Sequence, residues 1–203
     1  MLFRSKAQVA GFADAVAQRF GAAAMLINNA GQGRVANFAQ TSDEAWQEEL
    51  QLKFFSLIHP IRAFLPQLEA CADAAIVCVN SLLALQPEPH MVATSAARAG
   101  AQSLVRSLAR EFAPKGIRVN SVLLGLVDSD QWRRRFDARE AREERDQDWA
   151  AWSAALAARK GIELGRLGRP EEAAAAIFHL ATPASSYTTG SHLDVSGGLA
   201  HHI

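Results

Sequence analysis

Residues 76–100, which read IVCVNSLLALQPEPHMVATSAARAG, decide the fold of this chain. The apolar run at 76–79 is mostly β-branched, and such a short continuous run is typical of a strand buried on both faces of a parallel sheet. A loop with two prolines follows, and a helix of mostly small residues begins near Met91. This order of strand, loop and helix places ligand chemistry beyond the carboxyl end of the strand in open α/β sheets.

Three polar side chains of this stretch are expected to converge on one site. Ser81 follows directly after the predicted strand. Thr94 and Arg98 are four residues apart, so they lie on one face of the predicted helix. The pattern predicts that two hydroxyl groups and a guanidinium meet at one edge of the sheet.

The spacing of these residues resembles the active site of the short-chain dehydrogenase/reductase (SDR) family, a Ser followed thirteen residues later by Tyr-x-x-x-Lys. Ser81 stands in the Ser position, while Thr94 and Arg98 replace the Tyr and the Lys. The resemblance implies a Rossmann-like doubly wound parallel sheet in a single domain, 1–203. It also implies an NAD or NADP cofactor, a small-molecule carbonyl or alcohol substrate, and atypical catalytic residues at these three positions, with Arg98 also placed to contact the cofactor ribose.

Other stretches match the same family, and the resemblance assigns them to the cofactor. The loop Asn28-Asn29-Ala30-Gly31 follows a short apolar strand at 25–27. In the family this loop closes over the adenosine side of the cofactor, which implies contacts from Asn28, Ala30 and Gly31. The run at 117–125 matches the next family strand, and the resemblance implies a cofactor contact from Gly125 at its end. The residues that follow, Val127 and Ser129, are implied to hold the nicotinamide carboxamide.

Lys53 marks a further departure from the family pattern. The helix predicted over 43–65 carries Trp46, and seven residues later the family has an Asn that distorts the helix and holds a proton-relay water. Lys53 occupies that position. Two interpretations stay open, a solvated or salt-bridged side chain and a cation that faces the catalytic cleft.

Residues 130–165 combine mixed charges with aromatic residues at helical spacings. Surface helices with solvated charged faces explain most of this pattern. In the family this region is the variable lid over the substrate, and Trp132 and Phe136 would then help to bind a partly apolar, anionic molecule. His90 lies in the loop before the helix that begins near Met91. It is either solvated there or close enough to the site to supply a proton, since imidazole titrates near neutrality.

Composition narrows the choice of partners. The formal net charge is zero over 203 residues, which argues against nucleic acid or a membrane surface as an electrostatic partner. The spacing of the two cysteines favours neither a disulfide nor a metal site. No apolar run approaches a membrane span, so a cytoplasmic protein is expected. By resemblance, helices 43–65 and 91–113 would form a homodimer or homotetramer, although intramolecular packing explains their small residues nearly as well.

The resemblance covers the last three-quarters of a typical family member. The leading strands and the Gly-rich turn that receives the cofactor pyrophosphate in such sheets are not found before Asn28. A fragment of a longer protein is expected in preference to a natural half-sheet, because the latter would leave an unpaired apolar edge. Three functions compete: an SDR-type NAD(P)-dependent oxidoreductase, a catalytically inactive binding or dimerisation module, and a non-redox enzyme that uses Ser81 with His90.

Overall fold

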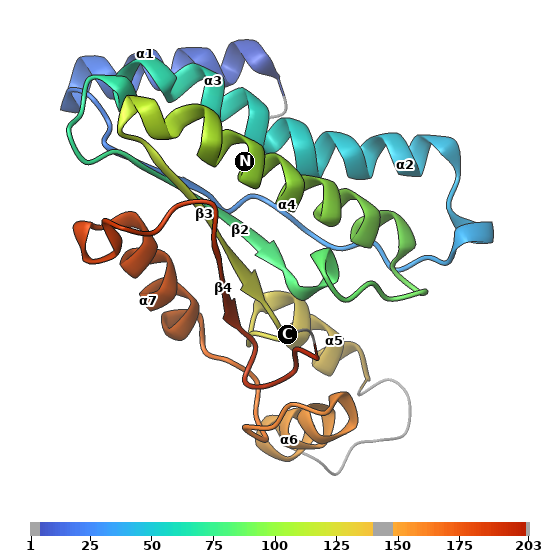
Figure 1. The fold of residues 1–203 in the computed structure, drawn as a ribbon. Helices are drawn as coiled ribbons and strands as arrows, with labels where there is room; N and C mark the ends of the chain where they lie inside the picture. Colours follow the sequence, from blue (N-terminus) through green and yellow to red (C-terminus); the bar gives the residue numbers. More distant parts are fainter. Residues whose placement is uncertain (1–4, 140–147, 202–203) are drawn as a thin grey trace.

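The computed structural model describes residues 5–139 and 148–201, and it shows one parallel sheet with helices on both faces (Figure 1). The strands are β1 Met25–Asn28, β2 Ala75–Ser81, β3 Arg118–Leu124 and β4 His192–Val195. They are paired in the order β1-β2-β3-β4, and each pair is parallel. The predicted α/β class with a Rossmann-like sheet is confirmed.

The helices divide between the two faces of the sheet. One face is covered by α1 Lys6–Phe20, α3 Ser56–Glu69 and α4 Val92–Phe112. The opposite face is covered by α7 Pro170–Ala181, which contacts all four strands (Figure 1). Beyond the carboxyl ends of the strands lie α5 Asp130–Arg139 and α6 Trp149–Lys160.

Strand β2 lies at the centre of the core, as its apolar sequence predicts. Alternate side chains of a strand point to opposite faces of the sheet. Ile76 accordingly packs into the cluster formed with α3 and α4, whereas Val77 packs against Leu180 of α7. Both side chains are fully buried because the sheet is covered on both faces.

The helix predicted over 43–65 is continuous but not uniform. It comprises α2 Asp43–Leu50, a π-helical turn over Gln51–Phe55, and α3. The hydroxyl of Ser42 caps α2 by accepting a hydrogen bond from the Ala45 amide at 3.3 Å. Such π-helical turns are rare and often occur at functional sites. Lys53 lies in this turn, at the position where the family has the Asn that distorts the helix.

Strand β1 forms one edge of the sheet, and its outward side chains are apolar. Met25 is 44% exposed and Ile27 is 40% exposed, although both belong to a short apolar strand. Exposed apolar edges invite pairing with another strand. Among the described residues, no helix combines the length and the apolar character needed to cross a membrane.

Candidate functional site

The parallel arrangement brings three strand ends to one edge of the sheet. Asn28 ends β1, Ser81 ends β2 and Leu124 ends β3, and the register aligns these ends closely. The loops that leave them contain most of the residues predicted to bind the cofactor. This edge is where open α/β sheets bind their ligands.

Arg98 extends from α4 to this edge. Its Nη1 donates a hydrogen bond to Asn80 Oδ1 at 3.2 Å, next to Ser81 in the chain. A methyl group added at Gly31 would lie 3.6 Å from Nη2, so the guanidinium faces the β1 loop closely. Its Nε is buried and has no hydrogen-bond partner among the described residues. An unpaired buried donor is costly, so Arg98 retains unused capacity for a ligand acceptor.

Ser81 is partly engaged in local structure. Its Oγ accepts a hydrogen bond from the Leu83 amide at 3.1 Å and so caps the short 3-10 turn Leu82–Ala84. The side chain is half-buried. A hydroxyl that accepts one bond can still donate its proton, so Ser81 can hydrogen-bond an incoming carbonyl oxygen.

Thr94 has a different environment from the one its spacing suggests. Its side chain is completely buried. The hydroxyl donates to Glu49 Oε2 at 2.6 Å and accepts a hydrogen bond from the Arg34 amide at 3.0 Å. The structure therefore brings Arg98 to Asn80 beside Ser81, but turns the Thr94 hydroxyl toward helix α2.

Lys53 is paired with Glu49 inside the protein. Its Nζ lies 3.4 Å from Glu49 Oε2, and each side chain is 4% exposed. The same ammonium donates to the backbone carbonyl of Gln32 in the loop that follows β1. Burial lowers the pKa of Lys53 to about 8, an effect that Glu49 opposes and the positive charge of Arg98 reinforces. Lys53 is thus salt-bridged, and it also lines a small cavity with Arg98, so its role as a cation facing the cleft stays a prediction.

Glu49 was missed by the sequence interpretation. It is 3% exposed and contacts two of the predicted catalytic residues, Lys53 and Thr94. One signal could have revealed it, because Glu49 and Lys53 are four residues apart on a predicted helix, the spacing of an ion pair on a single face. The burial of that face results from the packing of α4 against α2.

The predicted cofactor residues line the loops at the strand ends. Asn28 is buried, and its amide donates to Cys78 Sγ at 3.9 Å, which links β1 to β2. Gly125 lies against β4: a methyl group there would lie 2.8 Å from Ser196 Cβ. Val127 forms a parallel bridge with Gly168, and the exposed Ser129 begins the turn into α5 through its carbonyl.

The aromatic residues of the predicted lid pack against one another. Trp132 lies 6.4 Å from Trp152 between ring centres, and Phe136 lies 5.4 Å from Trp149 and 5.5 Å from Trp152. The charged run at 140–147 belongs to the predicted lid but lies outside the described residues. His90 is half exposed. Its imidazole Nδ1 lies 3.4 Å from Glu88 Oε2, a carboxylate of the same loop.

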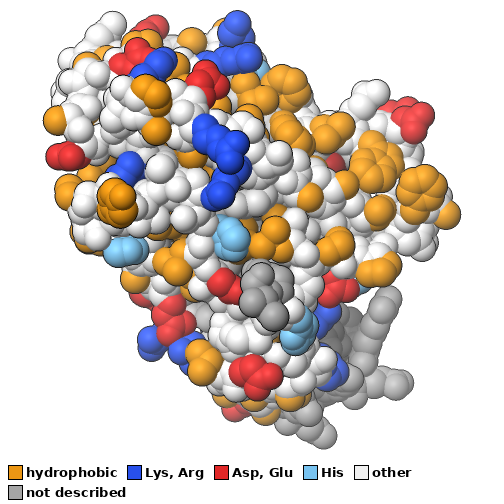
Figure 2. Space-filling model, viewed as in Figure 1, with side chains coloured by type: hydrophobic (Ala, Val, Ile, Leu, Met, Phe, Trp, Pro, Cys, Tyr) orange, Lys and Arg blue, Asp and Glu red, His pale blue; other side chains and the backbone are white. Residues whose placement is uncertain are grey.

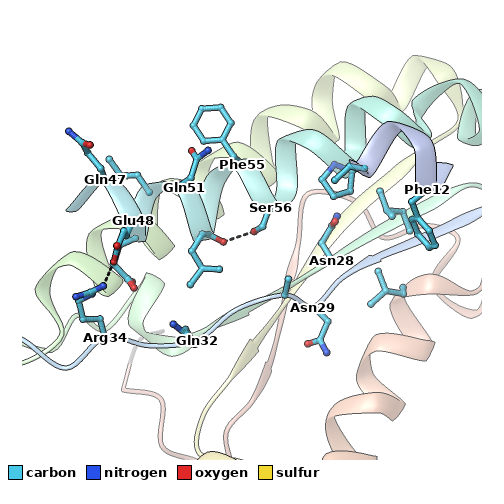
Figure 3. A pocket seen from close by; sticks show the side chains of 18 of the residues that line it. Phe12, Asn28, Asn29, Gln32, Arg34, Gln47, Glu48, Gln51, Phe55 and Ser56 are labelled. Atoms are coloured by element: carbon cyan, nitrogen blue, oxygen red, sulfur yellow. Dashed lines mark hydrogen bonds and ion pairs between the residues drawn. The ribbon is translucent and has the colours of Figure 1, made fainter. Parts of the chain in front are cut away.

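A large cavity lies beside the outer edge of β1 and not at Ser81 and Arg98. It has a volume of about 850 Å³ and lies between α1, β1 and the α2–α3 helix (Figure 3). The β1 loop contributes Asn28, Asn29 and Ala30 to its wall, so the cavity adjoins the predicted cofactor loop. No group of three or more potential metal ligands occurs within residues 5–139 and 148–201.

Comparisons with known proteins agree with this architecture. A family model described as enoyl-(acyl carrier protein) reductase matches residues 3–200. The 3-oxoacyl-[acyl-carrier-protein] reductase FabG of Chlamydia trachomatis is 31% identical over 176 residues, which are 87% of this chain and 65% of that protein. An uncharacterised short-chain type dehydrogenase/reductase of Sinorhizobium fredii is 32% identical over 202 residues, covering 97% of this chain and 73% of the relative.

Solved structures are similar over nearly the whole chain. An apo short chain oxidoreductase from Pseudomonas aeruginosa PAO1, described as containing an atypical catalytic center, has a TM-score of 0.95 and 69% identity, covering 98% of this chain and 75% of that one. Its NADPH-bound structure has a TM-score of 0.93 and 67% identity, with coverages of 98% and 74%. L-Sorbose reductase from Gluconobacter frateurii, complexed with NADPH and L-sorbose, has a TM-score of 0.92 and 25% identity, with coverages of 100% and 76%.

This chain spans about two thirds of the length of the Chlamydia reductase and about three quarters of the Pseudomonas oxidoreductase. The family match extends over nearly all of the sequence, including all four strands of the parallel sheet. The chain belongs to the short-chain dehydrogenase/reductase family.

Proposed function

We propose that this chain forms the catalytic part of an NAD(P)-dependent oxidoreductase that acts on a small carbonyl or alcohol substrate. The observation that supports it most is Arg98, a guanidinium held at the carboxyl edge of the sheet with a buried, unpaired Nε. The Pseudomonas oxidoreductase, 67% identical, has been solved with NADPH bound. The hydroxyl of Ser81 and the guanidinium of Arg98, both at the strand ends, are hydrogen-bond donors that suit a nucleotide with hydroxyl groups and a carboxamide.

Each site residue has a role in this proposal. The cofactor, when bound, supplies or accepts the hydride. Arg98 binds the ribose next to the nicotinamide, and Ser81 orients the substrate oxygen by donating its hydroxyl proton. The β1 loop with Asn28, Ala30 and Gly31 covers the adenosine side. The β3 loop holds the carboxamide through the remaining cofactor residues, Gly125, Val127 and Ser129.

The residues around this core would complete the reaction site. Thr94 stands where the family has its proton donor, and Lys53 contributes a second cation behind Arg98. Trp132, Phe136 and His90 would border the substrate from the lid side. The mixed aromatic and arginine-rich surface there suits a partly apolar, anionic substrate, with Arg133 stacked 3.7 Å from the centre of the Trp149 ring.

A catalytically inactive binding module is the second candidate, and one observation favours it. The Thr94 hydroxyl donates its proton to Glu49, deep inside the protein, and threonine is a much weaker acid than tyrosine. Under this alternative the chain binds the nucleotide but oxidises no NADPH when carbonyl substrates are added. The oxidoreductase proposal requires turnover above the rate of the Ser81→Ala variant.

Replacing Arg98 by alanine is expected to weaken NADPH binding by about 10- to 100-fold, because a charge-assisted hydrogen bond contributes about 1.5–3 kcal/mol. The measurement is a titration of NADPH fluorescence with the purified chain. Arg110→Ala is the matched control, since Arg110 is an exposed arginine on the same helix. Equal affinity of the Arg98→Ala variant and the unchanged chain would refute the assigned role.

Homodimerisation through the predicted helices 43–65 and 91–113 is part of the proposal. Some of their small residues serve intramolecular packing, since a methyl group at Gly100 would lie 2.3 Å from the Phe54 ring. Other apolar side chains face solvent: Leu50 is 42% and Phe55 is 40% exposed. Figure 2 shows apolar side chains exposed over the α2 end of the molecule. These exposed residues are available for a partner helix.

Light scattering at micromolar concentration is expected to give twice the mass of one chain. Phe55→Glu should shift the mass toward the monomer, because a buried charge disfavours an apolar interface. Phe178→Glu is the control, since Phe178 is a more exposed aromatic residue on the opposite face of the sheet. A monomeric unchanged chain would contradict the dimer proposal.

A further inference from the structure

Three charged side chains are buried together where α2 and the π-helical turn pack against α4. Glu49 and Lys53 are both almost completely buried, and Arg98 is close enough to affect the pKa of Lys53. Ion pairs taken out of water gain little net stability, and apolar residues of similar volume often serve as well. The cluster is therefore a poor stabilising device, which suggests a role in the site.

In the described part of the chain, Glu49 is the only acidic residue in direct contact with Lys53 and Thr94. One of its oxygens, Oε2, lies 2.6 Å from Thr94 Oγ1 and 3.4 Å from Lys53 Nζ. Without it, two cations would face each other across a buried space. The carboxylate thus fixes both the charge and the direction of the lysine.

The contact made by Lys53 on its other side leads to the cofactor loop. Its ammonium donates to the carbonyl of Gln32, one residue after Gly31. The i, i+4 spacing brings Glu49 to the same ammonium that donates to the Gln32 carbonyl, so one cation contacts both the helix and the loop. A chain of contacts therefore extends from Glu49 through Lys53 to the loop predicted to cover the cofactor.

We propose that Glu49 is a positioning residue of the site, which holds Lys53 as a cation against the β1 loop and fixes the Thr94 hydroxyl at the same time. Glu49 does not touch the cofactor; it acts through Lys53 and Thr94. The inference rests on the proposed nucleotide site for its functional consequence, but the effect on Lys53 is independent of that site.

The titration of Lys53 gives the first test. The charged groups that act on it are Glu49 from α2 and Arg98 from α4, and Cys78 of β2 lines the same small cavity. The Cε resonance of ¹³C-labelled Lys53, assigned with the Lys53→Met variant, is followed by NMR against pH. Glu49→Gln is expected to lower the midpoint by about 1–3 pH units, since an opposite charge at this distance has an effect of that size. Glu48→Gln, on the exposed neighbour paired with Arg34, should leave it unchanged.

NADPH binding gives the second test. Glu49→Gln is expected to weaken NADPH binding by about tenfold or more at pH 7, whereas Glu48→Gln should not. If Glu49→Gln does not fold, the double variant Glu49→Gln/Lys53→Met removes both buried charges together. It should regain the melting temperature of the unchanged chain while still binding NADPH weakly.

Two results would overturn the inference. One is a Lys53 midpoint that is the same in the unchanged chain and Glu49→Gln. The other is a double variant that binds NADPH as tightly as the unchanged chain, which would make Glu49 a structural residue only. Failure of the unchanged chain to bind NADPH would refute the proposed nucleotide site instead, and the Lys53 titration would then decide the role of Glu49 alone.

Discussion

The free energy of unfolding is expected to rise by on the order of 3 kcal/mol between pH 8 and pH 10.5, owing to Lys53. Burial lowers the pKa of this lysine from 10.5 to about 8 in the folded chain. The unfolded chain keeps the proton up to about pH 10.5. Between these two values the unfolded state binds more protons, so stability rises with pH. Below pH 8 both states are protonated and the contribution is constant.

Urea unfolding at pH 7.5, 9 and 10.5 measures this rise. Groups that titrate elsewhere contribute to the unchanged chain and to Lys53→Met alike, so the difference between the two curves isolates Lys53. Lys160→Met, at the exposed end of α6, is the control and should follow the unchanged chain. Parallel curves for the unchanged chain and Lys53→Met would show that the lysine titrates normally.

Thr94→Val is expected to lower the free energy of unfolding by about 2–4 kcal/mol. Valine has the shape of threonine but offers no hydroxyl. The half-buried Arg34 amide then loses its acceptor, and the buried Glu49 loses the hydroxyl that donates to it. An unsatisfied half-buried donor and a weakened carboxylate contact together account for the loss.

Thr94→Ser is the matched control for this substitution. It keeps the hydroxyl and removes one methyl group, so a cost of about 1 kcal/mol is expected. Both variants are compared by urea unfolding at pH 7. A Thr94→Val protein as stable as the unchanged chain would mean that the hydroxyl network does not contribute to the fold.

The fold could be predicted because its signals are local. The apolar run at 76–79 is sufficient to indicate a strand covered on both faces. In the structure β2 buries side chains on both faces of the sheet. Helical periodicity likewise predicts α4. The small and the large apolar residues of this stretch recur at helical spacing, and a single helix contains them all. Such patterns depend only on residues that are close together in the chain, so they can be read without knowing the fold.

The site could be predicted only in part because its contacts join distant segments. Spacing places Thr94 and Arg98 on one face of α4, but it does not show that α2 lies beside Thr94 while β2 lies beside Arg98. The buried state of Glu49 depends on the same helix packing. The aromatic residues of α5 and α6 do cluster as their spacing indicates, whereas their service as a substrate lid stays a prediction.

A crystal structure of this chain with NADPH shows directly whether the cofactor binds at the strand ends. The nicotinamide ribose is expected within hydrogen-bond distance of the Arg98 guanidinium, and the carboxamide beside Val127. An NADPH molecule held only in the cavity beside β1, with the Arg98 Nε still unpaired, would contradict this placement of the cofactor.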